Sequence, residues 1–281
     1  MKNKKEKEPE FLTSAINSQV INYKVYYLSK KQKVLYYFIL FAAGGLIAQI
    51  FYGGLFKDAG EATIATYISN ILFFLFGGLL AIKMMLPVVT ERLRKQRLSL
   101  LKTQFRDFLS SLSAALSTGM NMNEAIENSY ADLSSQYGED SIIANEIKEI
   151  INCINNNVSI EEAILALGER SGIEDISNFS TVFAVSFETG GNIKDIVSRT
   201  SDIIVDKMLT NEEIETKLTS NKIQLYAMLV IPVVLMLLMR FMSSSFAESF
   251  ASLIGVIAIT IALALFFVAY KIGSKMLDVK G

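Results

Sequence analysis

Side chains that could carry out chemistry are few in this chain. It has no histidine, which removes the commonest general base and a frequent metal ligand. Its one cysteine, Cys153, can form neither an internal disulfide nor a thiolate zinc site, and we expect a buried, unreactive thiol on a helix. The sequence also lacks the glycine-rich loops of nucleotide-binding proteins and the GxSxG motif of serine hydrolases. We therefore predict no enzymatic activity, no catalytic residue, no cofactor and no metal.

The acidic residues are spread along predicted helices, where a solvated surface is their ordinary role. A Ca²⁺ site between helical hairpins is an alternative, but the carboxylates lack the spacing of an EF-hand. The formal net charge is −1, so the whole chain has no basic excess suited to nucleic acid.

One short pattern occurs three times and predicts three helix-to-helix corners. It reads GMNMNEAI from Gly119, NVSIEEAI from Asn157 and GGNIKDIV from Gly190. In each copy Gly or Asn can adopt the left-handed conformation that ends a helix. A residue suited to capping the next helix follows, and three positions later an acidic residue completes a capping box or complements the helix dipole. The caps and their acidic partners are Asn121 with Glu124, Ser159 with Glu162, and Asn192 with Asp195.

The region around these corners is predicted to be helical. No proline occurs between Thr90 and Asn221, and apolar residues recur at helical spacing, as in Phe105, Phe108 and Leu112. We predict six helices, near residues 98–118, 122–136, 140–155, 160–170, 174–188 and 193–219, the last continuing into a membrane span.

Four stretches without charged residues are long enough to cross a bilayer. They are Val34–Phe56, Ala62–Ile82, Ile223–Met239 and Ser249–Tyr270. A crossing helix needs roughly 20 apolar residues, with about 17 as the lower limit, so the third stretch is marginal. Pro232 lies in its middle and suggests a kink. The first stretch is too long for a signal-peptide core and is expected to be an uncleaved signal anchor.

Lysine and arginine residues orient these spans. They gather before the first span, after the second, before the third and after the fourth, whereas the two short connections hold only Lys57 and Arg240. The positive-inside rule then places both termini and the central region in the cytoplasm. The fold class that follows is all-α: a polytopic membrane protein with four transmembrane helices and a six-helix cytoplasmic bundle inserted between two membrane hairpins.

The predicted organisation has five parts. They are a cytoplasmic N-terminal segment at 1–33, a first hairpin at 34–86, a cytoplasmic helical domain at 91–221, a second hairpin at 223–270 and a cytoplasmic tail at 271–281. Within the first part, residues 11–28 are expected to form either an amphipathic helix at the membrane interface or a plain tether.

At its corners the sequence resembles the type II secretion system F family. The run from Leu116 to Ile126 has the family's helix-ending Gly, capping residue and acidic-Ala-apolar sequence. Glu188-Thr189-Gly190 matches the acidic residue, any residue and Gly that open the last cytoplasmic helix, and Pro232 lies in the following span. The resemblance covers about Phe105 to Val234. It departs from the family at Asn157, where Gly is usual. One copy of the domain with two spans on each side is closest to the Tad/Flp pilus platform proteins.

The resemblance implies a non-catalytic inner-membrane platform for pilus assembly or protein secretion. The implied partners are a cytoplasmic secretion ATPase, a paralogous platform protein, pilin subunits and membrane lipid, in a homo- or hetero-oligomer. Glu188 and Gly190 are the candidate docking residues, although Glu188 could instead form an ion pair inside the domain.

Two other classes of membrane protein fit less well. A small transporter, or a transporter-associated subunit, is the main alternative, but ion-coupled carriers place ionisable side chains in their spans and these spans hold none. A receptor would need an outer sensing domain, and the outward loops are too short for one.

Overall fold

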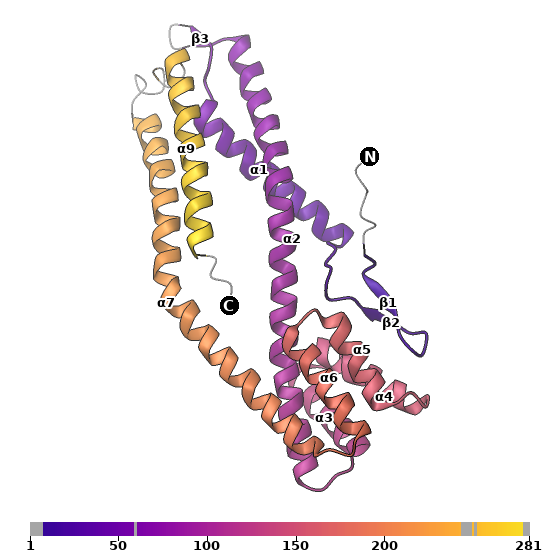
Figure 1. Ribbon diagram of the computed structural model, residues 1–281. Coiled ribbons are helices and arrows are strands. Elements are labelled where there is room, and N and C mark those ends of the chain that lie inside the picture. The colour runs from indigo at the N-terminus through magenta and orange to yellow at the C-terminus, as the bar shows by residue number, and fades with distance from the viewer. Residues whose placement is uncertain (1–7, 59–60, 243–248, 250–251, 278–281) are drawn as a thin grey trace, which may run out of the picture. The chain divides into compact units, whose positions relative to one another are not determined.

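The computed structural model describes residues 8–58, 61–242, 249 and 252–277, and most of them are helical (Figure 1). The helices are α1 (Lys30–Tyr52), α2 (Ile64–Ser117), α3 (Met122–Tyr137), α4 (Ile142–Asn155), α5 (Ile160–Ser171), α6 (Glu174–Glu188), α7 (Ile193–Met242) and α9 (Leu253–Leu277). Two antiparallel pairs of short strands accompany them: β1 (Phe11–Thr13) with β2 (Gln19–Ile21), and β3 (Lys57–Asp58) with β4 (Glu61–Ala62).

The chain divides into two compact units, which we call the helical unit and the apolar unit. The described part of the helical unit is residues 8–27 and 90–209, and that of the apolar unit is the described residues from 28–89 and 210–277. Helices α2 and α7 each contribute one part to each unit.

The N-terminal segment differs from both sequence expectations. Residues 11–28 form neither an interfacial helix nor a plain tether. Instead β1 and β2 make a hairpin, and Tyr23 after it is fully buried in the core of the helical unit. The reason is tertiary: Tyr23 packs with apolar residues far away in the sequence, so local periodicity gives no sign of it.

The core of the helical unit is built from one apolar face of each of its helices. Phe105 and Phe108 of α2 contact each other, and Phe105 meets Phe179 of α6 edge-on with ring centroids 5.5 Å apart. Offset and edge-on arrangements of this kind suit the charge distribution of aromatic rings. Buried isoleucines of α4 and α5, together with Val197 and Ile204 of α7, complete the cluster.

Helix α2 is longer than either element predicted along it. It runs without a break through the predicted span at 62–82 and the predicted helix at 98–118, and it contains Pro87. Proline has no amide hydrogen, so one backbone bond of the helix is lost there. Helix α7 likewise joins the predicted helix at 193–219 to the apolar stretch that follows, and it contains Pro232.

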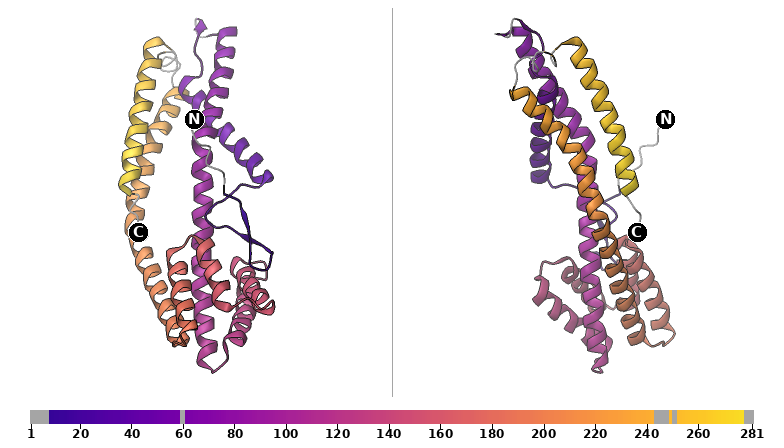
Figure 2. Two further views of the ribbon diagram at one scale, coloured as in Figure 1. Left: turned by 45° about the vertical axis from the view of Figure 1, so that its right-hand side comes forward. Right: turned by 90° about the vertical axis from the view of Figure 1, so that its left-hand side faces the viewer.

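Three helices among the described residues are long and apolar enough to cross a membrane. They are Lys30–Tyr52, the N-terminal part of α2 and Ile254–Gly273. The fourth predicted span, Ile223–Met239, is a shorter apolar stretch, so a count of four remains a prediction. Within the apolar unit, α9 lies beside the C-terminal part of α7 in both views of Figure 2, and Gly273 lets its backbone approach the Leu225 side chain.

Helices α1 and α2 contact each other at a sequence motif that occurs once in each of them. FAAGGLIA at 41–48 and FLFGGLLA at 74–81 share the pattern F-x-x-G-G-L-x-A. A Cβ added at Gly44 would lie 2.4 Å from the Cβ of Ala81, and one at Gly77 would lie 2.4 Å from the Cβ of Ala48. The contact is therefore reciprocal and brings the two backbones together, as small residues do between membrane helices.

Candidate functional site

The three corners have closely related backbone geometry. Gly119, Asn157 and Gly190 have φ angles of 90°, 61° and 72°, which is the left-handed region. After α4 the amide of Val158 donates to the carbonyl of Cys153 at 2.9 Å, and after α6 the amide of Gly191 donates to the carbonyl of Ser186 at 2.7 Å. These bonds satisfy carbonyls that a helix end would otherwise leave unpaired.

Each corner also begins the next helix with a side-chain cap. The Asn121 side chain accepts from the amide of Glu124 at 3.0 Å, and the Glu124 carboxylate accepts from the amide of Asn121 at 3.2 Å. This is a complete capping box. The remaining two caps accept one bond each: Ser159 from the amide of Glu162 at 3.3 Å, and Asn192 from the amide of Asp195 at 3.4 Å.

Glu188 and Gly190 lie at the surface where α6 turns into α7. Both residues are exposed, and a Cβ added at Gly190 would meet nothing within 4 Å. No ion pair in the described part of the chain involves Glu188. The carboxylate is therefore accessible to a partner.

A buried polar network, which is absent from the sites predicted from the sequence, joins the N-terminal segment to α4 and α5. Arg170 pairs with Glu146 through both terminal guanidinium nitrogens, of which Nη1 lies 2.8 Å from Oε1. The hydroxyl of Tyr23 donates to the same Oε1 at 2.5 Å, and Arg170 also donates to the carbonyl of Ile21. Burial, and then the Glu146 carboxylate, raise the pKa of Tyr23 well above its ordinary value, so the phenol stays a neutral donor.

The guanidinium of Arg170 stays charged in this setting. Burial lowers its pKa, but the hydrogen bond and charge of Glu146 outweigh burial, and the net shift is upward. One signal in the sequence could have pointed to the network. Glu146 lies on the same face of its helix as Ile143, Ile147 and Ile150, where a lone carboxylate needs a buried partner.

Arg97 of α2 secures the same segment from another side. Its guanidinium lies 5.4 Å from the ring centre of Tyr23 and 4.9 Å from that of Tyr26, within cation–π range. It also donates to the carbonyl of Val25 at 2.8 Å. The residues just before α1 are thereby fixed to α2.

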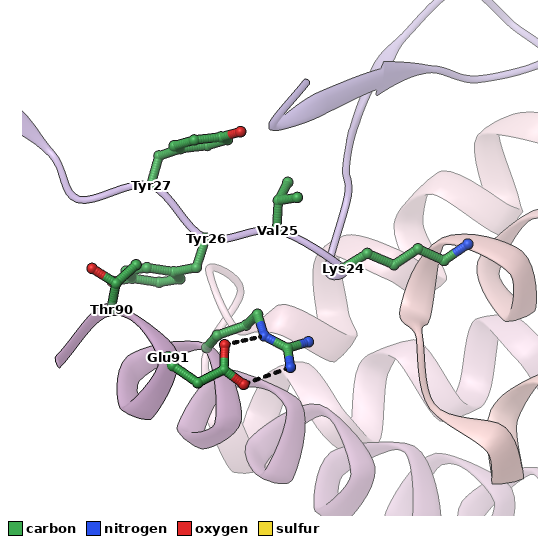
Figure 3. A pocket seen from close by; sticks show the side chains of 7 residues that line it. Lys24, Val25, Tyr26, Tyr27, Thr90 and Glu91 are labelled. Carbon is green, nitrogen blue, oxygen red and sulfur yellow. Dashed lines mark hydrogen bonds and ion pairs between the residues drawn. The ribbon is translucent and has the colours of Figure 1, made fainter. Parts of the chain in front are cut away.

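A shallow hollow lies beside this attachment, lined by Lys24, Val25, Tyr26, Tyr27, Thr90, Glu91 and Arg94 (Figure 3). Arg94 and Glu91 form a two-bond ion pair within it, at 2.7 and 2.9 Å. The Lys24 side chain extends away from that pair. Because Arg94 is already paired with a carboxylate, the hollow is a poor anion site.

Asp175, in the first turn of α6, links two other helices of the helical unit. Its Oδ2 lies 2.8 Å from the ammonium of Lys102 on α2, and its Oδ1 bonds the ammonium of Lys207 on α7. Burial raises the pKa of Asp175, but the two lysines outweigh burial and hold it below its ordinary value. The carboxylate is therefore ionised at neutral pH and ties α2, α6 and α7 together.

Charge is unevenly distributed along the helical unit. Residues 122–188 contain thirteen carboxylates and two cations, a net charge of −11. Residues 92–106 contain six cations and no carboxylate.

Within the described residues, no group of three or more His, Cys, Asp or Glu side chains is placed to hold a metal ion.

Comparison with protein families identifies the region that carries these features. Residues 108–241 match the family model described as type II secretion system (T2SS), protein F. The match supports the type II secretion system F family. No curated protein and no solved structure matches the chain.

The F-family region contains the three corners, Asp175, Glu146 and Arg170. It excludes Tyr23 and Arg97, which complete the buried network from outside the matched residues. The apolar helices, together with the match, point to an inner-membrane protein.

Proposed function

We propose that this protein is a non-catalytic platform subunit in the inner membrane of a type II secretion-like or Tad/Flp pilus machine. It couples a cytoplasmic secretion ATPase to the extraction and assembly of filament subunits. The observation that carries this proposal is the F-family match over residues 108–241 in a chain that also has membrane-length apolar helices.

The Tad/Flp assignment rests on domain count. The match occurs once, and candidate spans lie in the chain both before and after the helical unit. The platform is a homo- or hetero-oligomer with a paralogous subunit, is surrounded by lipid, and receives pilin subunits that are extracted from the membrane.

In this proposal the helical unit lies in the cytoplasm, as do both termini. The uneven distribution of Lys and Arg supports this topology, because cytoplasmic flanks of membrane helices are enriched in these residues. Single cysteines at Asp58 and at the exposed Ser135, in a variant lacking Cys153, test it with an impermeant outside reagent. The topology predicts labelling at Asp58 and not at Ser135, and labelling at Ser135 but not at Asp58 would overturn it.

The ATPase docks on the helical unit at or near the α6–α7 corner. Glu188 and Gly190 are accessible there, and the carboxylate has no ion-pair partner among the described residues. Glu188→Lys should weaken filament assembly without unfolding the protein. The Glu188 side chain is exposed and forms no ion pair with the described residues, so the fold does not depend on its charge.

A clean deletion strain distinguishes this function from transport. The proposal predicts loss of surface filaments or of the secreted protein, while the filament subunit stays stable in the membrane. Normal filaments and secretion in a strain with no paralogue to compensate would refute it. A defect in solute uptake in the same strain would favour the small transporter or transporter-associated subunit.

A further inference from the structure

The outward face of α6 has an unusual centre. Helices α3–α6, whose residues are all described, expose only two large apolar side chains, Val182 at 50% and Val185 at 57%. Both lie on this one face, three residues apart and therefore adjacent along the helix. We call the exposed residues Glu174, Asn178, Thr181, Val182, Val185 and Glu188 the α6 face.

The two valines are not needed for the fold of α6. Its opposite side holds Ile176, Phe179 and Phe183 in the core, which is enough to fix the helix in place. β-Branched residues lose side-chain freedom in a helix, so an exposed helix position normally favours other residue types. An adjacent apolar pair within a polar surround has the arrangement of a small contact surface, in which an apolar centre is bordered by a polar rim.

The charge around the valines indicates what can cover them. Glu174 and Glu188 lie at the two ends of the face, and residues 122–188 have a net charge of −11. Of the two cations in that stretch, Arg170 is buried against Glu146 and Lys148 lies at the surface. The neighbouring helices α2 and α7 bring Lys102 and Lys207 close to the Glu174 end of the face, but both ammonium groups pair with Asp175. Such a surface repels anionic lipid and nucleic acid and attracts a basic protein surface.

We propose that the α6 face binds a protein surface with an apolar centre surrounded by Lys and Arg side chains, and that this surface belongs to the secretion ATPase. The inference rests on the proposed function and adds the chemistry of the contact. Val182 and Val185 provide the apolar centre, and Glu174 and Glu188 set the charge and the orientation. Open space at Gly190 leaves the adjoining corner free for the partner's approach.

The test is a binding measurement on the full chain. The protein in lipid nanodiscs is titrated with the purified secretion ATPase of the same cell, at low and at raised salt. The double variant Val182→Thr/Val185→Thr keeps the side-chain shape and removes the apolar surface. Its control is Ile203→Thr on α7, an equally exposed apolar residue outside the α6 face.

The wild type and Ile203→Thr should bind with the same Kd, and the double variant should bind about tenfold more weakly. Added salt should weaken wild-type binding, and Glu188→Gln should reduce that salt dependence. A photo-crosslinking residue at Thr181 should capture the ATPase, and one at Glu127 on α3 should not.

Two results would overturn the inference in distinguishable ways. If the ATPase binds and the double variant binds equally well, with no crosslink from Thr181, the α6 face is wrong and the platform function stands. If the ATPase binds neither the wild type nor any variant, both the assignment of the α6 face and the proposed coupling to the ATPase are wrong.

Discussion

At the scale of single residues, the caps of the three corners are the features that local sequence predicts best. A cap needs only its own side chain and an amide three residues later, so Asn121 and Glu124 can be recognised without knowledge of the fold. Tyr23 is the opposite case, because its importance arises from contacts with Glu146 and Arg97, more than 70 residues away. No local pattern could have placed it.

Removing a cap should lower stability by a modest amount. Asn121→Ala and Ser159→Ala should each cost about 1 kcal/mol, since one amide at the start of a helix loses its acceptor. Cys153 offers a natural reporter: it is buried, and burial raises the pKa of its thiol, so a thiol-reactive dye labels it only when the helical unit opens.

The measurement is dye labelling of the full-length protein in detergent against denaturant concentration. Asn123→Ala, an exposed amide in the same turn as the first cap, is the matched control and should leave the midpoint unchanged or slightly higher. Unchanged midpoints for Asn121→Ala, Ser159→Ala and Asn192→Ala would refute the role of these residues as caps.

Breaking the buried ion pair should cost considerably more. Arg170→Met leaves the Glu146 carboxylate buried without its cation, and the expected loss is about 3–5 kcal/mol. Lys148→Met removes a cation of similar length from the exposed side of α4 and is the control. The same dye assay measures both variants, and a similar midpoint for the two would contradict the network described here.

At the scale of elements, the helices were predictable and their continuity was not. The six helical ranges follow from apolar spacing and corner residues, but nothing in the sequence around Pro87 shows that α2 continues from a membrane-length apolar stretch into the helical unit. Proline interrupts one hydrogen bond and packing decides the rest. The strands β1 and β2 were also missed, because segments of three residues are too short for a period to appear.

The ion pairs between Asp175 and its two lysines predict that the stability of the folded protein depends on pH. The folded-state pKa of Asp175 is lowered, so its stabilising contribution is complete above its ordinary pKa of about 4 and is lost as the pH falls through the folded value. Asp175→Asn should therefore be less stable than the wild type at neutral pH, and the difference should shrink in acid.

Circular dichroism on heating, at pH 7 and at pH values below about 4, measures this difference in the full-length protein. Glu174→Gln is the control, because it removes a carboxylate from the same turn of α6 that forms none of the described ion pairs. If the difference in melting temperature between Asp175→Asn and the wild type is the same at every pH, the ion pairs of Asp175 contribute nothing to stability.

The crossing of α1 and α2 makes a prediction of its own. Gly44→Val or Gly77→Val places a side chain where the opposing backbone carbonyl lies within 2.7 Å of the added Cβ, so the helices must separate. The expected cost is about 1–3 kcal/mol. The measurement is size-exclusion chromatography after heating. The temperature at which half of the protein is lost from its peak should be lower for both variants than for the wild type. It should not fall for Ala43→Val, which lies on the exposed side of α1.

At the scale of the whole molecule, the chain combines two kinds of surface with different chemistry. The apolar helices suit lipid, and the strongly acidic residues 122–188 suit a basic partner. Residues 8–27 belong to the helical unit although they precede the first candidate span, so that unit is built from chain segments on both sides of the first hairpin. A fragment starting at residue 91 would lack Tyr23 and would leave part of the core uncovered.

We propose that this protein connects a secretion ATPase to filament subunits in the inner membrane. The most direct test is to crosslink living cells, isolate the tagged full-length protein in detergent and quantify its companions by mass spectrometry, with an unrelated tagged multi-span protein as the reference. We expect enrichment of both the secretion ATPase and the filament subunit, with ATPase enrichment reduced by Val182→Thr/Val185→Thr. Enrichment of neither protein over the reference would contradict it.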